Sequence, residues 1–207
     1  MVQTKSKEEV VQEYRIQSIQ EATMRVIARK GMAAATMQEI AEEAGVAKGT
    51  IYLYFRDRDE LVEKTFERAI TDLIKHIDSA MDTVGSFHDK LRAALAAKIS
   101  FFNDNREFFR LYVSLRLPEG NAAQQRRHRR TCEPQYKGAF DHFAAQLEAA
   151  MKAEEIRQFD SQRLALFIIE STNAIVLDRV MSEAPPPDEV DVAFMTDVLF
   201  DGIRKRS

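Results

Sequence analysis

The chain has 207 residues, one cysteine and a formal net charge of −3 at pH 7. This length can bury a sizeable core, and a single cysteine, Cys132, excludes the disulfide framework of a small secreted domain. No signal-peptide pattern and no run of about 18 apolar residues occurs, so we expect a cytoplasmic protein with no membrane contact. Residues 1–58 carry nine Lys and Arg against eight Asp and Glu, so charge balance alone does not indicate nucleic-acid binding.

The first predicted helix runs from about Lys7 to Lys30. Gly31 is its natural stop, because glycine readily adopts the backbone conformation that ends a helix. Its apolar stripe recurs at helical spacing. The stripe consists of Ile19, Ala22, Thr23, Val26 and Ile27. We expect this helix to pack against the segment that follows it.

Residues 36–55, TMQEIAEEAGVAKGTIYLYF, predict two short helices joined by a tight turn. Thr36 and Glu39 have the spacing of a capping box, and Gly45 suits a left-handed turn residue. Ile51 and Phe55 lie one turn apart on the inward side of the second helix. Its outward side suits contact with phosphates and base edges. Both an ordinary helical hairpin and a helix-turn-helix fit this pattern.

The individual residues favour the helix-turn-helix. The string IAEEAGVAKGTIYLYF, followed by RDRDEL, resembles the DNA-binding signature of the tetracycline repressor (TetR) family, I-A-x-x-A-G-V-S-x-G-T-[LI]-Y-x-[YH]-F-x-x-K-x-x-L. The matching positions are Ile40, Ala41, Ala44, Gly45, Val46, Gly49, Thr50, Ile51, Tyr52, Tyr54, Phe55 and Leu61. Ala47 departs from the signature where a capping serine is frequent, and Arg58 departs where lysine is usual.

This resemblance covers roughly residues 15–61 and implies an all-α fold of about nine helices. It implies a DNA-binding domain at residues 1–56 and an effector-binding and dimerisation domain at residues 57–207. The implied partner is a palindromic or near-palindromic operator DNA, bound by a homodimer. The candidate DNA-binding residues are Thr36, Lys48, Gly49, Thr50, Tyr52, Tyr54 and Arg58.

Asp57 and Glu60 predict a second capping box, and apolar residues then keep helical spacing as far as Met81. This helix touches both predicted domains, so it is the candidate coupler between them. Gly85 breaks it, and Ser86 starts a further helix. The inward residues of that helix are Leu91, Leu95, Ile99 and Phe102.

A short aromatic helix is predicted from about Asn105 to Leu117, ended by Pro118. Residues 121–152 are again predicted to be helical, and Pro134 either kinks this helix or starts a second piece. The basic run at residues 124–130 is most simply a solvated helix face, with a second DNA contact as the alternative.

Aromatic residues at helical spacing in the C-terminal part of the chain fit either an ordinary core or the lining of a small-molecule site. The family resemblance implies an effector pocket there, and we expect a largely apolar effector. The candidate ligand-binding residues are Phe102, Phe109, Tyr112, His142, Phe143, Phe167, Glu170 and Asn173.

The helix predicted from Ser161 to Ser182 is apolar around most of its surface, so it has to be covered on more than one side. Three prolines then form a stiff connector, and Asp188 is predicted to cap a last helix with a wide apolar stripe. We expect the two helices to form a four-helix interface in a homodimer. The candidate interface residues are Phe167, Ile168, Ile175, Val176, Phe194, Val198 and Leu199.

Catalytic signatures are missing from the sequence. The four histidines lack metal-site spacing, and Cys132 lacks the local signature of a nucleophile and its base. We therefore predict no enzymatic activity, no metal and no cofactor. The predicted function is repression relieved by a small-molecule effector. The alternatives are an activator or co-repressor-dependent regulator, and a helical interaction module without DNA binding.

Overall fold

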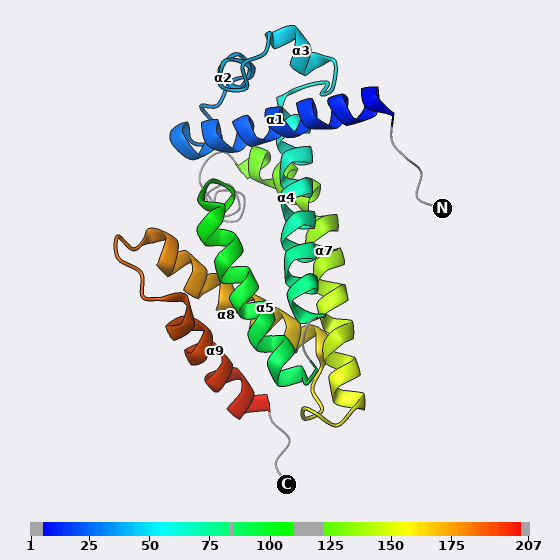
Figure 1. Ribbon diagram of the computed structural model, residues 1–207, viewed down its shortest axis with the longest axis vertical. Coiled ribbons are helices and arrows are strands. Elements are labelled where there is room, and N and C mark those ends of the chain that lie inside the picture. The colour runs from blue at the N-terminus through cyan, green and yellow to red at the C-terminus, as the bar shows by residue number, and fades with distance from the viewer. Residues whose placement is uncertain (1–5, 83–84, 110–121, 204–207) are drawn as a thin grey trace. The chain divides into compact units, whose positions relative to one another are not determined.

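The structure, a computed structural model, describes residues 6–82, 85–109 and 122–203, and for residues 122–136 and 203 it describes the backbone only (Figure 1). The elements in these residues are helices, in agreement with the predicted all-α fold. They are α1 (Lys7–Lys30), α2 (Met37–Glu43), α3 (Lys48–Tyr52), α4 (Arg58–Met81), α5 (Phe87–Asp104), α7 (Ala122–Lys152), α8 (Ser161–Met181) and α9 (Asp188–Ile203). Residues 106–109 are helical as well.

The chain divides into two compact units, each with its own core. Unit 1 contains Met1–Ala69 and Glu107–Cys132, and unit 2 contains Ile70–Arg106 and Glu133–Ser207. Helix α4 is continuous across this division, so its first half belongs to unit 1 and its second half to unit 2.

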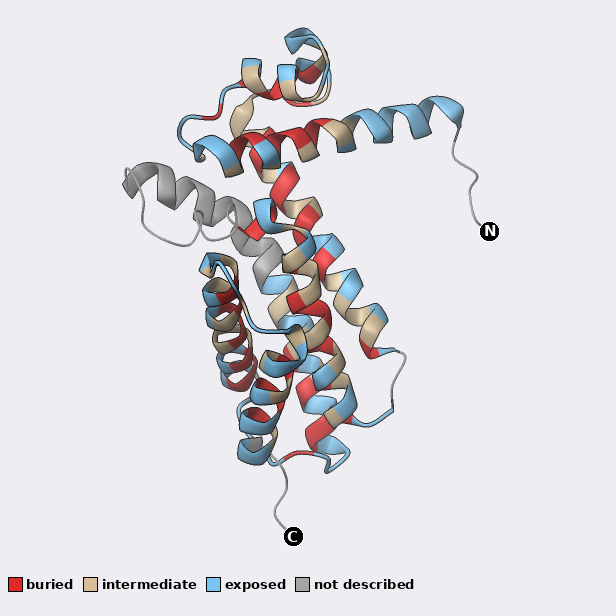
Figure 2. Ribbon diagram, turned by 60° about the vertical axis from the view of Figure 1, so that its left-hand side comes forward, coloured by how far each residue is buried: buried red, intermediate tan, exposed pale blue. Residues whose placement is uncertain are grey.

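The core of unit 1 forms where α1, α2, α3 and the start of α4 bury their apolar sides. The whole predicted stripe of α1, from Ile19 to Ile27, is buried. The largest buried side chains that α2, α3 and α4 add are Ile40, Ile51, Leu61 and Phe66. In contrast, residues 7–15 of α1 are exposed on every side, and Figure 2 shows these first turns in pale blue. Only the C-terminal half of α1 therefore serves the core.

Local signals set the ends of α1. Ser6 and Glu9 form a capping box at its start, in which each backbone N–H donates to the other side chain. Gly31 follows its last residue with a φ of +82°, which a side chain would disfavour. Both predicted ends, Lys7 and Lys30, are confirmed.

Unit 2 is a helical bundle in which α5 packs against α8 and α9. The predicted inward residues of α5, from Leu91 to Phe102, are all buried. Helix α7 runs without a break through Pro134, so that proline does not start a second helix. Most of the helix predicted from Asn105 to Leu117, and the side chains of the basic run at 124–130, lie outside the described residues.

The predicted capping role of Asp188 is wrong. Asp188 is the first residue of α9, and its two carboxylate oxygens each accept a hydrogen bond from Asn103 Nδ2 at 2.9 Å. The same carboxylate pairs with Arg179, whose side chain is only 4% exposed. A buried guanidinium is costly without an anionic partner, so Asp188 is recruited to Arg179 rather than to the backbone of α9.

Candidate nucleic-acid interface

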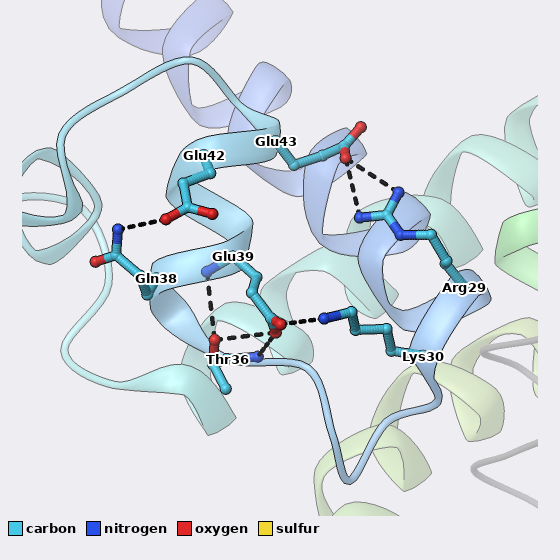
Figure 3. Close-up of polar contacts among 7 residues, drawn as sticks. All are labelled: Arg29, Lys30, Thr36, Gln38, Glu39, Glu42 and Glu43. Carbon is cyan, nitrogen blue, oxygen red and sulfur yellow. Dashed lines mark hydrogen bonds and ion pairs between the residues drawn. The ribbon is translucent and has the colours of Figure 1, made fainter.

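Helices α2 and α3 are built by the local signals that the sequence predicts. The backbone N–H of Glu39 donates to Thr36 Oγ1 at 3.3 Å, and the Thr36 N–H donates to the Glu39 carboxylate at 3.1 Å (Figure 3). Gly45 then has a φ of +66°, and the N–H of Val46 donates back to Ala41 at 3.0 Å. These bonds close the first helix and turn the chain into the second within a few residues.

Helix α3 presents one face to the core and another to solvent. Ile51 and Phe55 are buried. Of the candidate DNA-binding residues in this segment, Lys48, Gly49 and Tyr52 are exposed, and Thr50 and Tyr54 are partly exposed. Leu53, which the sequence analysis does not single out, is 77% exposed and is the most exposed large apolar residue beside this face. The predicted outward side is therefore available to a partner.

Two further candidates flank these helices. Thr36 is exposed, although its hydroxyl already takes part in the capping box of α2. Arg58 begins α4 and its side chain is 21% exposed, with Nη1 lying 3.8 Å from a carboxylate oxygen of Asp59. Its Nε and Nη2 are buried without a hydrogen-bond partner, so this guanidinium retains unused donors.

Most of the cations of unit 1 whose side chains the structure describes are paired with nearby carboxylates. Glu43 accepts from Arg25 Nε at 2.8 Å. Figure 3 shows that Glu43 also accepts from Arg29, at 3.2 Å, and that Glu39 pairs with Lys30. Hydrogen bonds from Lys30 and then Thr36 lower the pKa of Glu39 below its ordinary value of 4.5.

Hydrogen bonds from cations also lower the pKa of Glu43, the second glutamate that pairs with α1. The hydrogen bonds from Arg25 and then Arg29 lower this pKa below 4.5.

In contrast to these paired cations, Lys48 on α3 makes no ion pair and no side-chain hydrogen bond with any residue that the structure describes. A free, exposed cation at the start of a surface helix is suited to a phosphate.

Comparison with known proteins identifies this arrangement. Residues 19–65, which span the core half of α1, the α2–α3 pair and the start of α4, match the model of the bacterial regulatory proteins of the tetR family. The chain belongs to the TetR family. It is a DNA-binding transcriptional regulator, and this family consists of regulators rather than enzymes.

Relatives extend the match over the rest of this TetR-family chain. The regulator YhgD of Bacillus subtilis is 24% identical over 175 residues, which cover 84% of this chain and 88% of YhgD. The fatty acid degradation regulator FadR of Bacillus halodurans has the same fold, with a TM-score of 0.81 at 22% identity over 99% of this chain and all of that one. FadR of Bacillus subtilis, solved in complex with stearoyl-CoA, has a TM-score of 0.80 at 21% identity, covering 91% and 99%.

Unit 2 of this TetR-family regulator holds most of the candidate ligand-binding residues, in different environments. Phe102 and Asn173 are buried, Phe143 and Glu170 are half-buried, and Asn173 Nδ2 donates to Glu170 at 3.4 Å. Two others are exposed. Phe167 is 59% exposed, and His142 is an exposed residue whose Nε2 lies 3.1 Å from Asp78 Oδ1. Phe109 is buried and belongs to unit 1, and Tyr112 lies outside the described residues.

One polar residue in this bundle is missed by the sequence analysis. Lys98 on α5 is buried, and its Nζ donates to the carbonyl of Ile169 on α8 at 3.4 Å. Its position between the inward residues Leu95 and Ile99 is the signal that could have identified it, because a lysine at a core-facing position of a helix is unusual.

The candidate dimer residues separate into two groups. Ile168, Val176 and Leu199 are buried by the chain itself, so they cannot offer surface to a partner. The remaining four stay at least partly accessible: Phe167, Ile175, Phe194 and Val198. Sequence periodicity marks a wide apolar stripe but does not show which part of it the chain's own helices cover.

Among the described residues, no helix combines the length and the apolar character needed to cross a bilayer. In the same part of the chain, no three His, Cys, Asp or Glu side chains come together as a metal-ligand set.

Proposed function

We propose that this regulator is a repressor that binds operator DNA as a homodimer and leaves it when a small effector binds. Residues 1–56 would contact DNA, and residues 57–207 would bind the effector and form the dimer. The observation that carries the proposal is the outward face of α3, where Lys48 and Tyr52 are exposed and Lys48 has no acidic partner among the described residues. Neighbouring cations such as Arg25, in contrast, are neutralised by Glu43.

The proposed mechanism depends on the distance between two copies of α3. A two-fold dimer can place both in successive major grooves only when they are about 34–36 Å apart or at a multiple of that distance. An effector that binds better to a dimer with another spacing shifts the population away from DNA. A 100-fold loss of affinity for DNA requires a coupling free energy of about 2.7 kcal/mol between effector binding and DNA binding. Helix α4 is the candidate coupler, because one continuous helix belongs to both units.

The effector class that we propose to test first is long-chain acyl-CoA. Its support is the fold shared with FadR of Bacillus subtilis, which was solved with stearoyl-CoA. The apolar interior of unit 2, with Phe102 and Leu95 buried on α5, is chemically suited to an acyl chain. The buried cation of Lys98 is suited to an anionic or carbonyl head group.

The DNA part of the proposal is tested with a labelled duplex from the regulator's own upstream region. We expect Lys48→Ala and Tyr52→Ala each to lower affinity at least tenfold, because each removes an exposed contact, with no change in thermal midpoint. The matched control is Lys64→Ala, an exposed lysine of unit 1 that pairs with Glu67 at 2.7 Å. Unchanged affinity in both α3 variants would contradict the assignment.

The salt dependence and the sign of regulation are separate tests. If a dimer neutralises about 6–10 phosphates, log affinity falls against log salt with a slope of about −5 to −9. A reporter behind the same DNA distinguishes repression from activation: deleting the regulator raises expression from a repressed promoter and lowers it from an activated one. Adding long-chain acyl-CoA is expected to release the duplex, whereas tighter binding would indicate a co-repressor.

A further inference from the structure

The exposed first turns of α1 and the end of α3 form a groove of 510 Å³ within unit 1. Lys7, Glu8, Val11 and Arg15 line it from α1, and Leu53 and Tyr54 line it from the turn that directly follows α3. Lys7, Val11 and Arg15 are spaced by four residues, so they lie along one side of the helix. Tyr54, one of the candidate DNA-binding residues, therefore also lines the groove.

The cations of this groove differ from those farther along the same helix. Arg25, Arg29 and Lys30 are all held by carboxylates of α2, as Figure 3 shows for the last two. Lys7 and Arg15 make no ion pair and no side-chain hydrogen bond with any described residue. An exposed cation without an internal partner is the kind of group that binds a phosphate.

The groove also carries exposed apolar surface. Val11 is 46% exposed and Leu53 is 77% exposed, and neither serves the core of unit 1. A DNA strand alternates an anionic phosphate with a largely apolar deoxyribose. Lys7 and Arg15, with Val11 between them, present both kinds of group, cationic and apolar, along one side of α1.

We propose that this groove binds the sugar-phosphate backbone of the operator, outside the base pairs that α3 contacts. The proposal rests on the proposed binding of operator DNA by α3. It adds a backbone contact from the first turns of α1, which supplies affinity and register but no base readout. Glu8 is the single acidic side chain lining the groove among the described residues, and it opposes a bound phosphate.

The charged residues of the groove allow a test in which two substitutions should change DNA affinity in opposite directions. We expect Arg15→Gln to weaken binding about threefold to tenfold, and to make the salt slope shallower by about 2 for a dimer, from about 0.9 per phosphate. Glu8→Gln, which removes the opposing charge and leaves the Ser6–Glu9 capping box intact, is expected to strengthen binding. The matched control is Arg29→Gln, which alters an exposed cation of the same helix that is already paired with Glu43.

The test compares two duplexes by fluorescence anisotropy: a long one, and a short one that ends at the outermost base pairs required by α3. The effects of Arg15→Gln and Glu8→Gln should appear on the long duplex and vanish on the short one. Equal effects on both duplexes, or no effect of either variant on the long one, overturn the proposal. Lys48→Ala distinguishes a failure of the groove proposal from a failure of the proposed DNA binding by α3. If α3 binds DNA, this variant should weaken binding to both duplexes, whether or not the groove contacts the backbone. If the true occupant of the groove is an apolar ligand, neither Arg15→Gln nor Glu8→Gln will change DNA affinity, which also overturns the proposal.

Discussion

At the scale of single residues, the start of α3 lacks the side-chain cap found at the starts of α1 and α2. Thr36 caps α2 with its hydroxyl, whereas Ala47 at the N-cap of α3 makes no side-chain hydrogen bond. The backbone of Ala47 has φ −67° and ψ 143°, the extended conformation that capping residues adopt. A hydroxyl placed there would find an unpaired backbone N–H of the first turn within reach.

We therefore predict that Ala47→Ser stabilises the protein by about 1 kcal/mol and raises its thermal midpoint by about 2–4 °C. Urea unfolding followed by circular dichroism measures the change. Ala47→Val is the matched control, since valine tolerates the extended backbone but carries no acceptor. Equal midpoints for the serine and valine variants would show that the cap contributes nothing.

Acid should weaken the contact between α1 and α2. The folded-state pKa of Glu43 lies below 4.5 because Arg25 and then Arg29 donate to its carboxylate. A group whose pKa is lower in the folded state contributes stability above its unfolded pKa and loses that contribution as pH falls through its folded pKa. The stability gained from Glu43 is thus present at pH 7 and disappears as the pH falls from about 4.5 through the folded pKa.

This prediction is checked by measuring the free energy of unfolding from pH 7 to pH 3. The wild type should lose stability more steeply below pH 4.5 than Glu43→Gln, which cannot titrate. Glu42→Gln is the control, since Glu42 lies next in sequence and its partner in Figure 3 is the neutral amide of Gln38, at 2.8 Å. If the free energy of unfolding falls in parallel with pH for the wild type and Glu43→Gln, the pH-dependent stability does not come from Glu43.

At the scale of elements, a buried charge network fastens α9 to its neighbours. Arg179 of α8 donates to the carbonyl of Pro186 in the connector at 2.9 Å, and it pairs with Asp188 and Asp191 of α9. Asn103 of α5 binds the same Asp188. This network therefore joins α8 to the connector and α9 that follow it, and it reaches the distant helix α5 through Asp188. Because that guanidinium is buried, loss of a partner is costly.

We predict that Asp191→Ala destabilises the protein by about 2–4 kcal/mol, because it leaves the buried Arg179 cation without one of its carboxylates. Chemical unfolding at pH 7 measures the loss. Asp197→Ala, an exposed aspartate of the same helix, is the matched control and should change stability by no more than about 0.5 kcal/mol. A similar loss in both variants would mean that the network adds no specific stability.

At the scale of the whole molecule, α8 and α9 leave apolar surface that the described residues do not cover. Leu166, Phe167, Phe194 and Val198 are each more than half exposed. Scattered exposed apolar residues are ordinary, but several on two helices that pack against each other point to a partner. A second copy of the same two helices would bury them in a two-fold interface, and obligate interfaces of this kind usually bury more than about 2,000 Å².

The dimer prediction is tested with Val198→Arg, which places a charge in the expected interface. We expect the wild type to sediment as a dimer at micromolar concentration, and the variant to sediment as a monomer or to aggregate. Operator binding should also be lost, although α3 is unchanged, because one subunit cannot span two half-sites. Val10→Arg, at an exposed valine of unit 1, is the sedimentation control. A monomeric wild type would refute the arrangement.

Local features of this protein could be read from the sequence alone. The Thr36–Glu39 capping box, the turn at Gly45 and the end of α1 at Gly31 all occur where the sequence predicts them. Each depends on a few adjacent residues and on the steric freedom of one glycine, so short patterns are sufficient to specify them. The family signature extends over the same short-range features, which is why the helix-turn-helix could be recognised before any fold was known.

Tertiary structure decided which side chains are available at the surface. Glu43 neutralises Arg25 across 18 residues of sequence, while nothing among the described residues neutralises Arg15. Lys98 is buried although lysine is usually exposed, and Asp188 binds Arg179 instead of capping α9. These outcomes depend on contacts between segments that are distant in the chain, and helical periodicity specifies only the face of each helix. The local sequence therefore determined the helices, whereas packing between them determined the free charges and the open apolar surface.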